Sequence, residues 1–250
     1  MSEPIPAATV VIFRNGSAGD PPEILMVERS NALRFAGGAA VFPGGRIDPA
    51  DHEFAAELAG GANADLAAAR IAAIRETLEE TGLVLSVHRP VDPEEAANAR
   101  RMLLECGRIA PVARHFDWRF DIDSLVYFAR WCPDFELAFD TRFFLADLGT
   151  GAVDIAVDAT ENSRLFWTSA RDALAAADGG DLHVIFPTRR NLERLAACAS
   201  FESASDQART TPVTMITPWR ERRDGRDMLV IPEGLGYPVT GEDYETAMRG

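Results

Sequence analysis

The sequence predicts an α/β fold, and three observations support that prediction. Short apolar or alternating segments of strand length recur along the chain, beginning with residues 8–13 and 23–27. Segments with helical periodicity lie between and after them, and the clearest of these ends at Gly82. Hydrophobic residues make up 47% of the 250 residues, which is enough for one large domain or a domain with an appendage.

The first two strands are expected to pair as a hairpin. The dipeptides Asn15-Gly16 and Pro21-Pro22 between them are typical of a turn. Residues 39–42 are interpreted as the end of a third strand, which leads into the turn Pro43-Gly44-Gly45. Because glycine has no Cβ, the backbone of this turn is open to close approach by other groups.

The segment before Gly82 is expected to be a helix. Asn63 or Asp65 can cap its start, and Gly82 can end it. At about 100° per residue, four residues fall within an arc of about 80°, namely Ile71, Ile74, Leu78 and Thr81. This stripe predicts a face that is buried against a core.

The opposite face of this helix carries three carboxylates. Glu76, Glu79 and Glu80 share an arc of about 100°. Like charges three and four positions apart repel one another, and only Arg75 offers compensation nearby. A divalent cation would relieve that repulsion, because Mg²⁺ prefers oxygen ligands. The ordinary alternative is an acidic face exposed to water.

Together the turn and the acidic helix resemble the signature of the Nudix hydrolases. The matching residues are Gly45 and, after a loop, Arg75-Glu76-x-x-Glu79-Glu80-x-Gly82-Leu83. The resemblance implies a mixed, curved β-sheet sandwiched between helices, and cleavage of a nucleoside diphosphate linked to another moiety. It also implies that Gly45, Glu76, Glu79 and Glu80 hold Mg²⁺ or Mn²⁺. In this interpretation Arg75 braces one glutamate through an ion pair.

The chain departs from that signature at its first acidic position. Asp51 stands where the family has glutamate, and an insertion at about residues 52–63 separates it from Arg75. The insertion is rich in Ala and Gly, so we expect a short helix and then a turn at Gly60-Gly61. The role of the first acidic residue is therefore left open, and Thr77 stands where an aliphatic residue is usual.

Residues before the turn narrow the resemblance to a subgroup. The pattern resembles the extended signature of Nudix enzymes that act on coenzyme A and its acyl esters, and its matching residues are Leu25-Met26, Ser30, Arg34, Gly38, Phe42, Asp48 and Asp51. Val27 departs from this extended signature, which has threonine at that position. Residues 139–145 and 191–195 resemble the acyl-coenzyme A branch, which also has an insertion in its signature.

The resemblance implies that Ser30, Arg34, Gly38 and Phe42 contact the substrate. For Ser30 and Arg34 the alternative is a turn cap and a surface cation. Glu161 precedes Trp167 by a spacing at which related enzymes often place a glutamate near the metals, although a loop carboxylate is usually solvated. Among the other aromatic residues, Trp118 and Trp131 are candidates to stack an adenine, with core packing as the default for both.

These features predict a metal-dependent diphosphatase. The expected substrate is coenzyme A or an acyl-coenzyme A, cleaved to 4′-phosphopantetheine, or its acyl form, and adenosine 3′,5′-bisphosphate. An ADP-ribose or NADH-type dinucleotide diphosphatase would use the same helix with different base and ribose contacts. A Nudix-fold sensor that binds a nucleotide without cleaving it is a further alternative.

The net charge of −14 argues against a nucleic acid as the main partner, because such binding depends on many Lys and Arg contacts to phosphate. A small nucleotide-derived substrate bridged by metal is compatible with it. No secretion signal or membrane-spanning run is evident, so we expect a cytoplasmic protein without a membrane partner. Three widely spaced cysteines indicate reduced thiols. Family members often dimerise, which leaves a homodimer open.

The remaining elements follow from periodicity and turn residues. Strands are expected at 83–87, 124–130 and 142–148, the last of them central, and helices at 92–106, after Trp167-Thr168-Ser169, and at 189–198. Residues 213–216 and 228–231 are expected to form an extra hairpin. We therefore expect a Nudix domain over residues 5–200 and a C-terminal extension over 201–250 that packs on it.

Overall fold

A mixed β-sheet forms the centre of the molecule. The computed structural model describes residues 3–15, 20–30, 37–59, 63–134, 138–148 and 162–249. The sheet contains β1 (Ile5–Arg14), β2 (Glu23–Arg29), β3 (Ala40–Val41), β4 (Gly44–Arg46), β5 (Val126–Trp131), β6 (Phe139–Asp147), β7 (Asn162–Ser169) and β8 (Met215–Ile216). Its main path runs β3-β2-β1-β6-β5-β8, while β4 pairs with β1 and β7 with β2. The β1–β6 pair is parallel and the β1–β2 hairpin is antiparallel, as expected.

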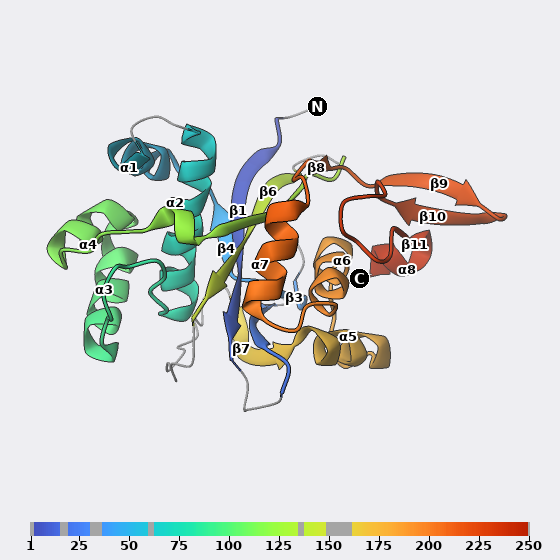
Figure 1. Ribbon diagram of the computed structural model, residues 1–250, viewed down its shortest axis with the longest axis horizontal. Coiled ribbons are helices and arrows are strands. Elements are labelled where there is room, and N and C mark those ends of the chain that lie inside the picture. Colours follow the sequence, from blue (N-terminus) through green and yellow to red (C-terminus); the bar gives the residue numbers. More distant parts are fainter. Residues whose placement is uncertain are drawn as a thin grey trace.

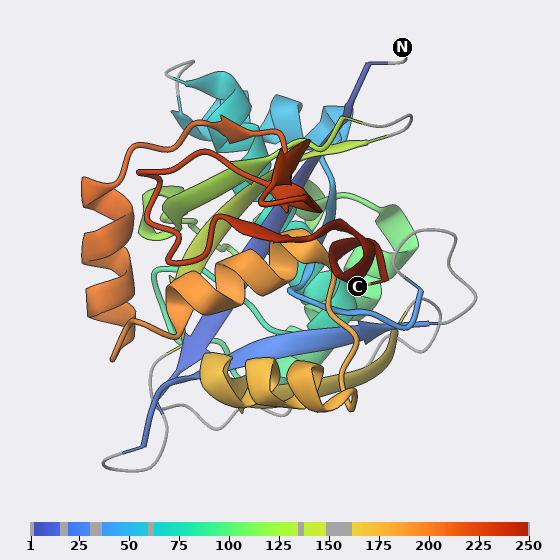
Figure 2. The same cartoon turned by 90° about the vertical axis from the view of Figure 1, so that its right-hand side faces the viewer.

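Helices cover both faces of this sheet (Figure 1). One layer holds α1 (Pro49–Ala59), α2 (Ala64–Thr81), α3 (Pro93–Cys106) and α4 (Ile109–His115), with the short 3₁₀ turn Ile122–Ser124 before β5. The other layer holds α5 (Ala170–Gly179), α6 (Phe186–Leu195) and α7 (Phe201–Thr210). Figure 2 looks onto this second layer, where α5 and α6 cross in front of the strands. The predicted class, a mixed sheet sandwiched between helices, is confirmed.

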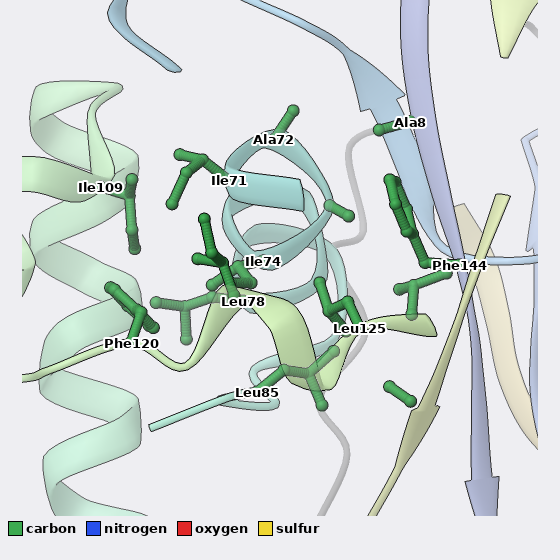
Figure 3. Close-up of a cluster of buried hydrophobic side chains, with 14 of the residues drawn as sticks. Ala8, Ile71, Ala72, Ile74, Leu78, Leu85, Ile109, Phe120, Leu125 and Phe144 are labelled. Carbon is green, nitrogen blue, oxygen red and sulfur yellow. The ribbon is translucent and has the colours of Figure 1, made fainter. Parts of the chain in front are cut away.

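The alternation of side chains along β1 explains why the sheet needs two helical layers. Val10 and Ile12 belong to a core that includes the apolar face of α2, whereas Val11 and Phe13 belong to a second core that includes α6 and α7. Successive side chains of a strand point to opposite faces, so a strand that is apolar at consecutive positions is buried on both sides. Figure 3 shows the first core, in which Ile71 lies on the side of α2 next to Ile109 of α4, while Ala8 and Phe144 of the sheet lie on the other side of the helix.

Helix α2 has the predicted bounds and faces. Asn63, which has a left-handed φ of 50°, lies directly before it, and Gly82, with φ 78°, ends it. The Gly82 N–H donates to the Leu78 carbonyl at 3.0 Å. Thr77 is tolerated inside the core because its hydroxyl donates to the Ala73 carbonyl at 2.7 Å. The stripe of Ile71, Ile74, Leu78 and Thr81 is buried, as the pattern predicts.

Two local predictions are wrong. The described residues 83–87 form no strand: Leu83 and Leu85 are buried in the first core, and Val87 makes one isolated bridge to Phe120. Ser86, which has a φ of 61°, interrupts the extended backbone that a ladder requires. Alternating apolar residues here reflect core contacts made by a connecting segment after the helix.

The second error concerns the C-terminal hairpin. Met215–Ile216 does not pair with residues 228–231 but adds to the main sheet, parallel to β5. The hairpin consists instead of β9 (Trp219–Arg223) and β10 (Arg226–Val230), and β11 (Gly241–Asp243) and α8 (Tyr244–Arg249) follow it. Its first strand is mostly charged, because it is exposed to water, and so lacks the apolar pattern of a buried strand. Helix α7 was not predicted.

Other features agree with the composition. The three cysteines all lie in the described chain and are free thiols. Of the helices that the structure describes, none combines the length and the apolar character needed to cross a bilayer.

Candidate active site

The glycine turn and the acidic helix meet as predicted. Strand β4 pairs with β1, which holds Gly44 and Gly45 over the carboxylate face of α2. The Gly44 N–H donates to Glu80 Oε2 at 3.0 Å. A Cβ on Gly45 would overlap the Glu76 carboxylate, so only glycine lets this carboxylate lie against the turn.

Arg75 links the acidic groups on both sides of the predicted insertion. Its Nη1 lies 2.8 Å from Glu76 Oε1 and 3.4 Å from Glu79 Oε2. Its Nε and Nη2 donate to Asp51 at 3.1 Å and 3.0 Å, and Nη2 also donates to the Arg46 carbonyl at 2.8 Å. Burial alone lowers the pKa of Arg75, but the Asp51 hydrogen bond and the surrounding carboxylates raise it, so the guanidinium stays charged.

The ionised form of Glu76 is disfavoured by its surroundings. The pKa of Glu76 is raised to about 8: burial is the largest cause, the charge of Arg75 opposes the shift, and repulsion by Glu80 and Glu79 adds to it. A carboxylate in this position is stabilised by a nearby positive charge. Arg75 supplies part of that charge, and a bound cation is the kind of group that would supply the rest.

The donors suit a divalent cation, although they are not gathered around one point. Among the described residues, no three His, Cys, Asp or Glu side chains are arranged to hold a metal ion. The chemistry of the set nevertheless fits: Glu76, Glu79 and Glu80 are hard oxygen donors, and the turn at Gly45 packs directly on one of them. Because Gly45 has no Cβ, the Glu76 carboxylate lies directly against the backbone of the turn.

These carboxylates line a cavity of about 690 Å³. Besides Arg75, two cationic side chains, Arg29 and Arg46, line it as well, and three threonines, Thr9, Thr141 and Thr188, offer hydroxyl groups. Asp48 also lines the cavity, and most of the remaining wall is apolar, formed by residues such as Val41, Phe42, Trp131, Pro133, Phe139, Phe143, Ile185 and Pro187. A cavity of this kind can hold a molecule with an anionic centre and an extended, less polar body.

Of the residues predicted to contact the substrate, only Phe42 lines the cavity within the described part of the chain. Phe42 is buried and lines the cavity, whereas the lining residues that the structure describes include neither Ser30 nor Gly38. Gly38 has a φ of 77° and closes a turn, because its N–H donates to the Arg29 carbonyl at 3.1 Å. Ser30 is half-buried at the end of β2. Arg34 and Glu161 lie outside the described residues.

The sequence does not predict that Arg29 and the residues at the start of α6 line the cavity. Arg29 ends β2 and follows an apolar run, a signal that could have marked it as facing a site, and its Nε is buried without a hydrogen-bond partner within the described chain. Ile185, Pro187 and Thr188 carry no local signal, because their place depends on tertiary packing. Trp131 is buried in the second core, as the default predicts, and it also lines the cavity, so its stacking on an adenine stays a prediction.

Comparison with known proteins identifies the domain. A family model described as the NUDIX domain matches residues 3–181. A NUDIX hydrolase from Alicyclobacillus acidocaldarius is similar, with 32% sequence identity and a TM-score of 0.70, over 82% of this chain and 97% of that chain.

Two more distant structures also match. The Ap4A hydrolase binary complex of C. elegans has 20% identity and a TM-score of 0.39, over 70% of this chain and 86% of that one. The NUDIX domain of Shewanella oneidensis NrtR complexed with ADP ribose has 14% identity and a TM-score of 0.42, over 77% and 86%. Neither overlaps closely enough to bear on the substrate of this chain.

Proposed function

The chain belongs to the Nudix family and is a pyrophosphohydrolase, and we propose that its substrate is coenzyme A or an acyl-coenzyme A. Hydrolysis of the diphosphate would release 4′-phosphopantetheine, or its acyl form, and adenosine 3′,5′-bisphosphate. The observation that carries this proposal is the cavity, which joins the carboxylates of α2 to an extended apolar wall.

We further propose that Mg²⁺ or Mn²⁺ is held by Glu76, Glu79 and Glu80 with the carbonyl of Gly45. Nudix hydrolases generally use divalent metal ions. When bound, such an ion neutralises charge on the substrate diphosphate and activates water for attack on phosphorus. The donor chemistry and the Gly45 cradle support this assignment.

The protein's own groups have distinct tasks in this proposal. Arg75 orients Glu76 and Glu79, and Asp51 in turn fixes Arg75. The Gly44 N–H orients Glu80. One of the three glutamates accepts the proton of the attacking water, since all three face the cavity.

Two features of the cavity support a coenzyme A substrate. Phe42, which belongs to the extended signature, lies in the wall. Arg29 and Arg46 provide positive charge near the carboxylates for phosphate oxygens, and a guanidinium suits that contact because it donates two parallel hydrogen bonds. The apolar residues then border the less polar arm of the substrate.

The test is a substrate panel assayed with purified protein and either Mg²⁺ or Mn²⁺. It contains coenzyme A, acyl-coenzyme A esters, ADP-ribose, NADH and nucleoside triphosphates, with products identified by mass spectrometry. We expect adenosine 3′,5′-bisphosphate and the matching pantetheine product from the coenzyme A compounds. A Glu80→Gln variant prepared identically is the control for contaminating hydrolases. Intact coenzyme A esters beside rapid cleavage of ADP-ribose or NADH would overturn the proposed substrate.

A further inference from the structure

Part of the cavity wall comes from outside the stretch that the family model matches. That stretch ends at residue 181, yet Ile185, Pro187 and Thr188, at the start of α6, line the cavity. The segment leading into α6 is tied to β3, the strand before the glycine turn, because the Ala40 N–H donates to the His183 carbonyl at 2.7 Å. Residues beyond the matched stretch are therefore structural parts of the substrate site.

A residue of the C-terminal extension, Tyr237, connects this wall to another. Trp131, at the end of β5, lines the cavity, although only 1% of its surface is exposed. Its indole N–H donates to the Tyr237 hydroxyl at 3.0 Å, and that hydroxyl donates to Asn191 Oδ1 at 2.9 Å. Asn191 belongs to α6. The Trp131 ring also meets the Phe186 ring of α6 edge to face, with centroids 6.1 Å apart. Tyr237 thus adds a hydrogen-bonded link between a lining residue of the sheet and the helix whose start carries further lining residues.

The Tyr237 hydroxyl suits this bridge because it donates and accepts at the same time. Tyr237 is 8% exposed, and burial raises its pKa, so the hydroxyl stays protonated and can donate. Its ring meets the Trp131 ring edge to face, with the centroids 5.6 Å apart. Removing the oxygen would leave two buried polar groups, one on each wall, without their partner.

Arg194 of α6 packs against Tyr237 and against Phe128 of β5. Its guanidinium lies 4.0 Å from the centroid of the Phe128 ring and 5.4 Å from that of Tyr237. It also donates to the Phe128 carbonyl at 3.0 Å and to Gln207 Oε1 of α7 at 2.9 Å. Helix α6, strand β5 and the extension are therefore held as one packed unit around Tyr237.

We propose that Tyr237 is a positioning residue that sets the spacing between Trp131 and α6, and so selects the substrate by the group attached to its diphosphate. Tyr237 is not among the described residues that line the cavity, and it acts through Trp131 and Asn191. The inference rests on the proposed function only in placing the substrate in this cavity. It does not require that the substrate be coenzyme A.

The test uses Tyr237→Phe, which keeps the ring and removes only the hydroxyl. Steady-state kinetics are measured on acyl-coenzyme A esters of increasing acyl length. We expect the ratio of kcat/KM between long and short esters to change by about tenfold, the effect of one buried hydrogen bond. The change should lie mainly in KM, because the carboxylates of α2 are untouched. Tyr244→Phe, in α8, is the matched control.

A second variant keeps the proposal testable if Tyr237→Phe is poorly folded. Trp131→Phe removes the donor from the other end of the same hydrogen bond. We expect it to shift selectivity in the same direction, and the double variant to add little to either single change. Equal fold-changes for all substrates, or an unchanged ratio beside a lower melting temperature, would show that Tyr237 is merely structural.

Failure of the proposed substrate would be recognisable separately. If the wild-type protein cleaves no coenzyme A compound, the same variants are assayed on ADP conjugates whose attached groups differ in size, such as ADP-ribose and NADH. A selectivity change in Tyr237→Phe would then support the positioning role of Tyr237, although coenzyme A would no longer be the proposed substrate. An unchanged selectivity in that series would overturn the positioning role of Tyr237 as well.

Discussion

The guanidinium of Arg75 makes a two-pronged hydrogen bond to the carboxylate of Asp51, although the two residues are 24 positions apart in the chain. Asp51 is 1% exposed and Arg75 is 4% exposed. The Asp48 N–H donates to Asp51 Oδ2 at 2.9 Å, which orients the carboxylate. The acidic position that the sequence leaves in doubt therefore fixes the arginine that contacts Glu76 and Glu79.

We expect Asp51→Asn to destabilise the protein and to impair catalysis. The substitution leaves Arg75 as a buried charge without its main partner, which costs about 3 kcal/mol in the free energy of unfolding. Loss of the brace should also lower kcat, because Glu76 and Glu79 are no longer oriented. Urea unfolding and steady-state kinetics measure the two effects. Asp48→Asn is the control, since its carboxylate lies 3.6 Å from Arg75 and is half exposed. Equal effects of both substitutions would contradict the assigned role of Asp51.

Glu79→Gln should abolish most of the activity without harming the fold. Several kcal/mol of transition-state stabilisation depend on a cation held by the carboxylates, so kcat should fall by about 100-fold or more. The melting temperature without metal should stay the same or rise, because one of three repelling charges is gone. Glu105→Gln, an exposed position on α3, is the control. Wild-type activity in Glu79→Gln would remove this glutamate from the mechanism.

Metal binding should be visible in the stability of the protein. A ligand that binds only the folded state at about 100 times its Kd adds about 2.7 kcal/mol. We therefore expect Mg²⁺ or Mn²⁺ to raise the melting temperature in calorimetry, and a chelator to reverse the rise. Glu76→Gln should lose most of this gain, whereas Glu105→Gln should retain it. A gain of the same size in Glu76→Gln would argue that the cation binds elsewhere.

The sequence predicts those parts of the site that depend on local periodicity. The phase of the carboxylates on α2, its end at Gly82 and the turn at Gly44 follow from helix geometry and from glycine's conformational freedom. The predicted core stripe is buried for the same reason, since one face of an amphipathic helix packs on the sheet.

The parts that were missed depend on contacts between distant segments. The pairing of Asp51 with Arg75 spans α1, and no local pattern encodes it. The packing of Tyr237 on Trp131 spans 106 positions. Leu83 and Leu85 alternate like a strand because they enter the core, although within the described part of the chain they belong to no strand ladder.

Arg100 of α3 provides a last test of how the catalytic helix is held. Its Nε donates to the Glu79 carbonyl at 2.9 Å and its Nη2 to the Glu80 carbonyl at 3.3 Å. The last turn of α2 has no basic residue of its own, so Arg100 supplies both hydrogen bonds and a charge that complements the helix dipole.

We expect Arg100→Met to lower the free energy of unfolding by about 1–2 kcal/mol, because two helix-end carbonyls lose their donor. Since those carbonyls belong to Glu79 and Glu80, kcat should fall and the apparent affinity for Mg²⁺ should weaken. Arg101→Met is the control, because Arg101 is exposed and its guanidinium donates to Asn98 of the same helix. Urea unfolding and Mg²⁺ titration of activity measure the outcome. An Arg100→Met protein that loses stability but keeps its Mg²⁺ dependence would limit Arg100 to a role in the fold.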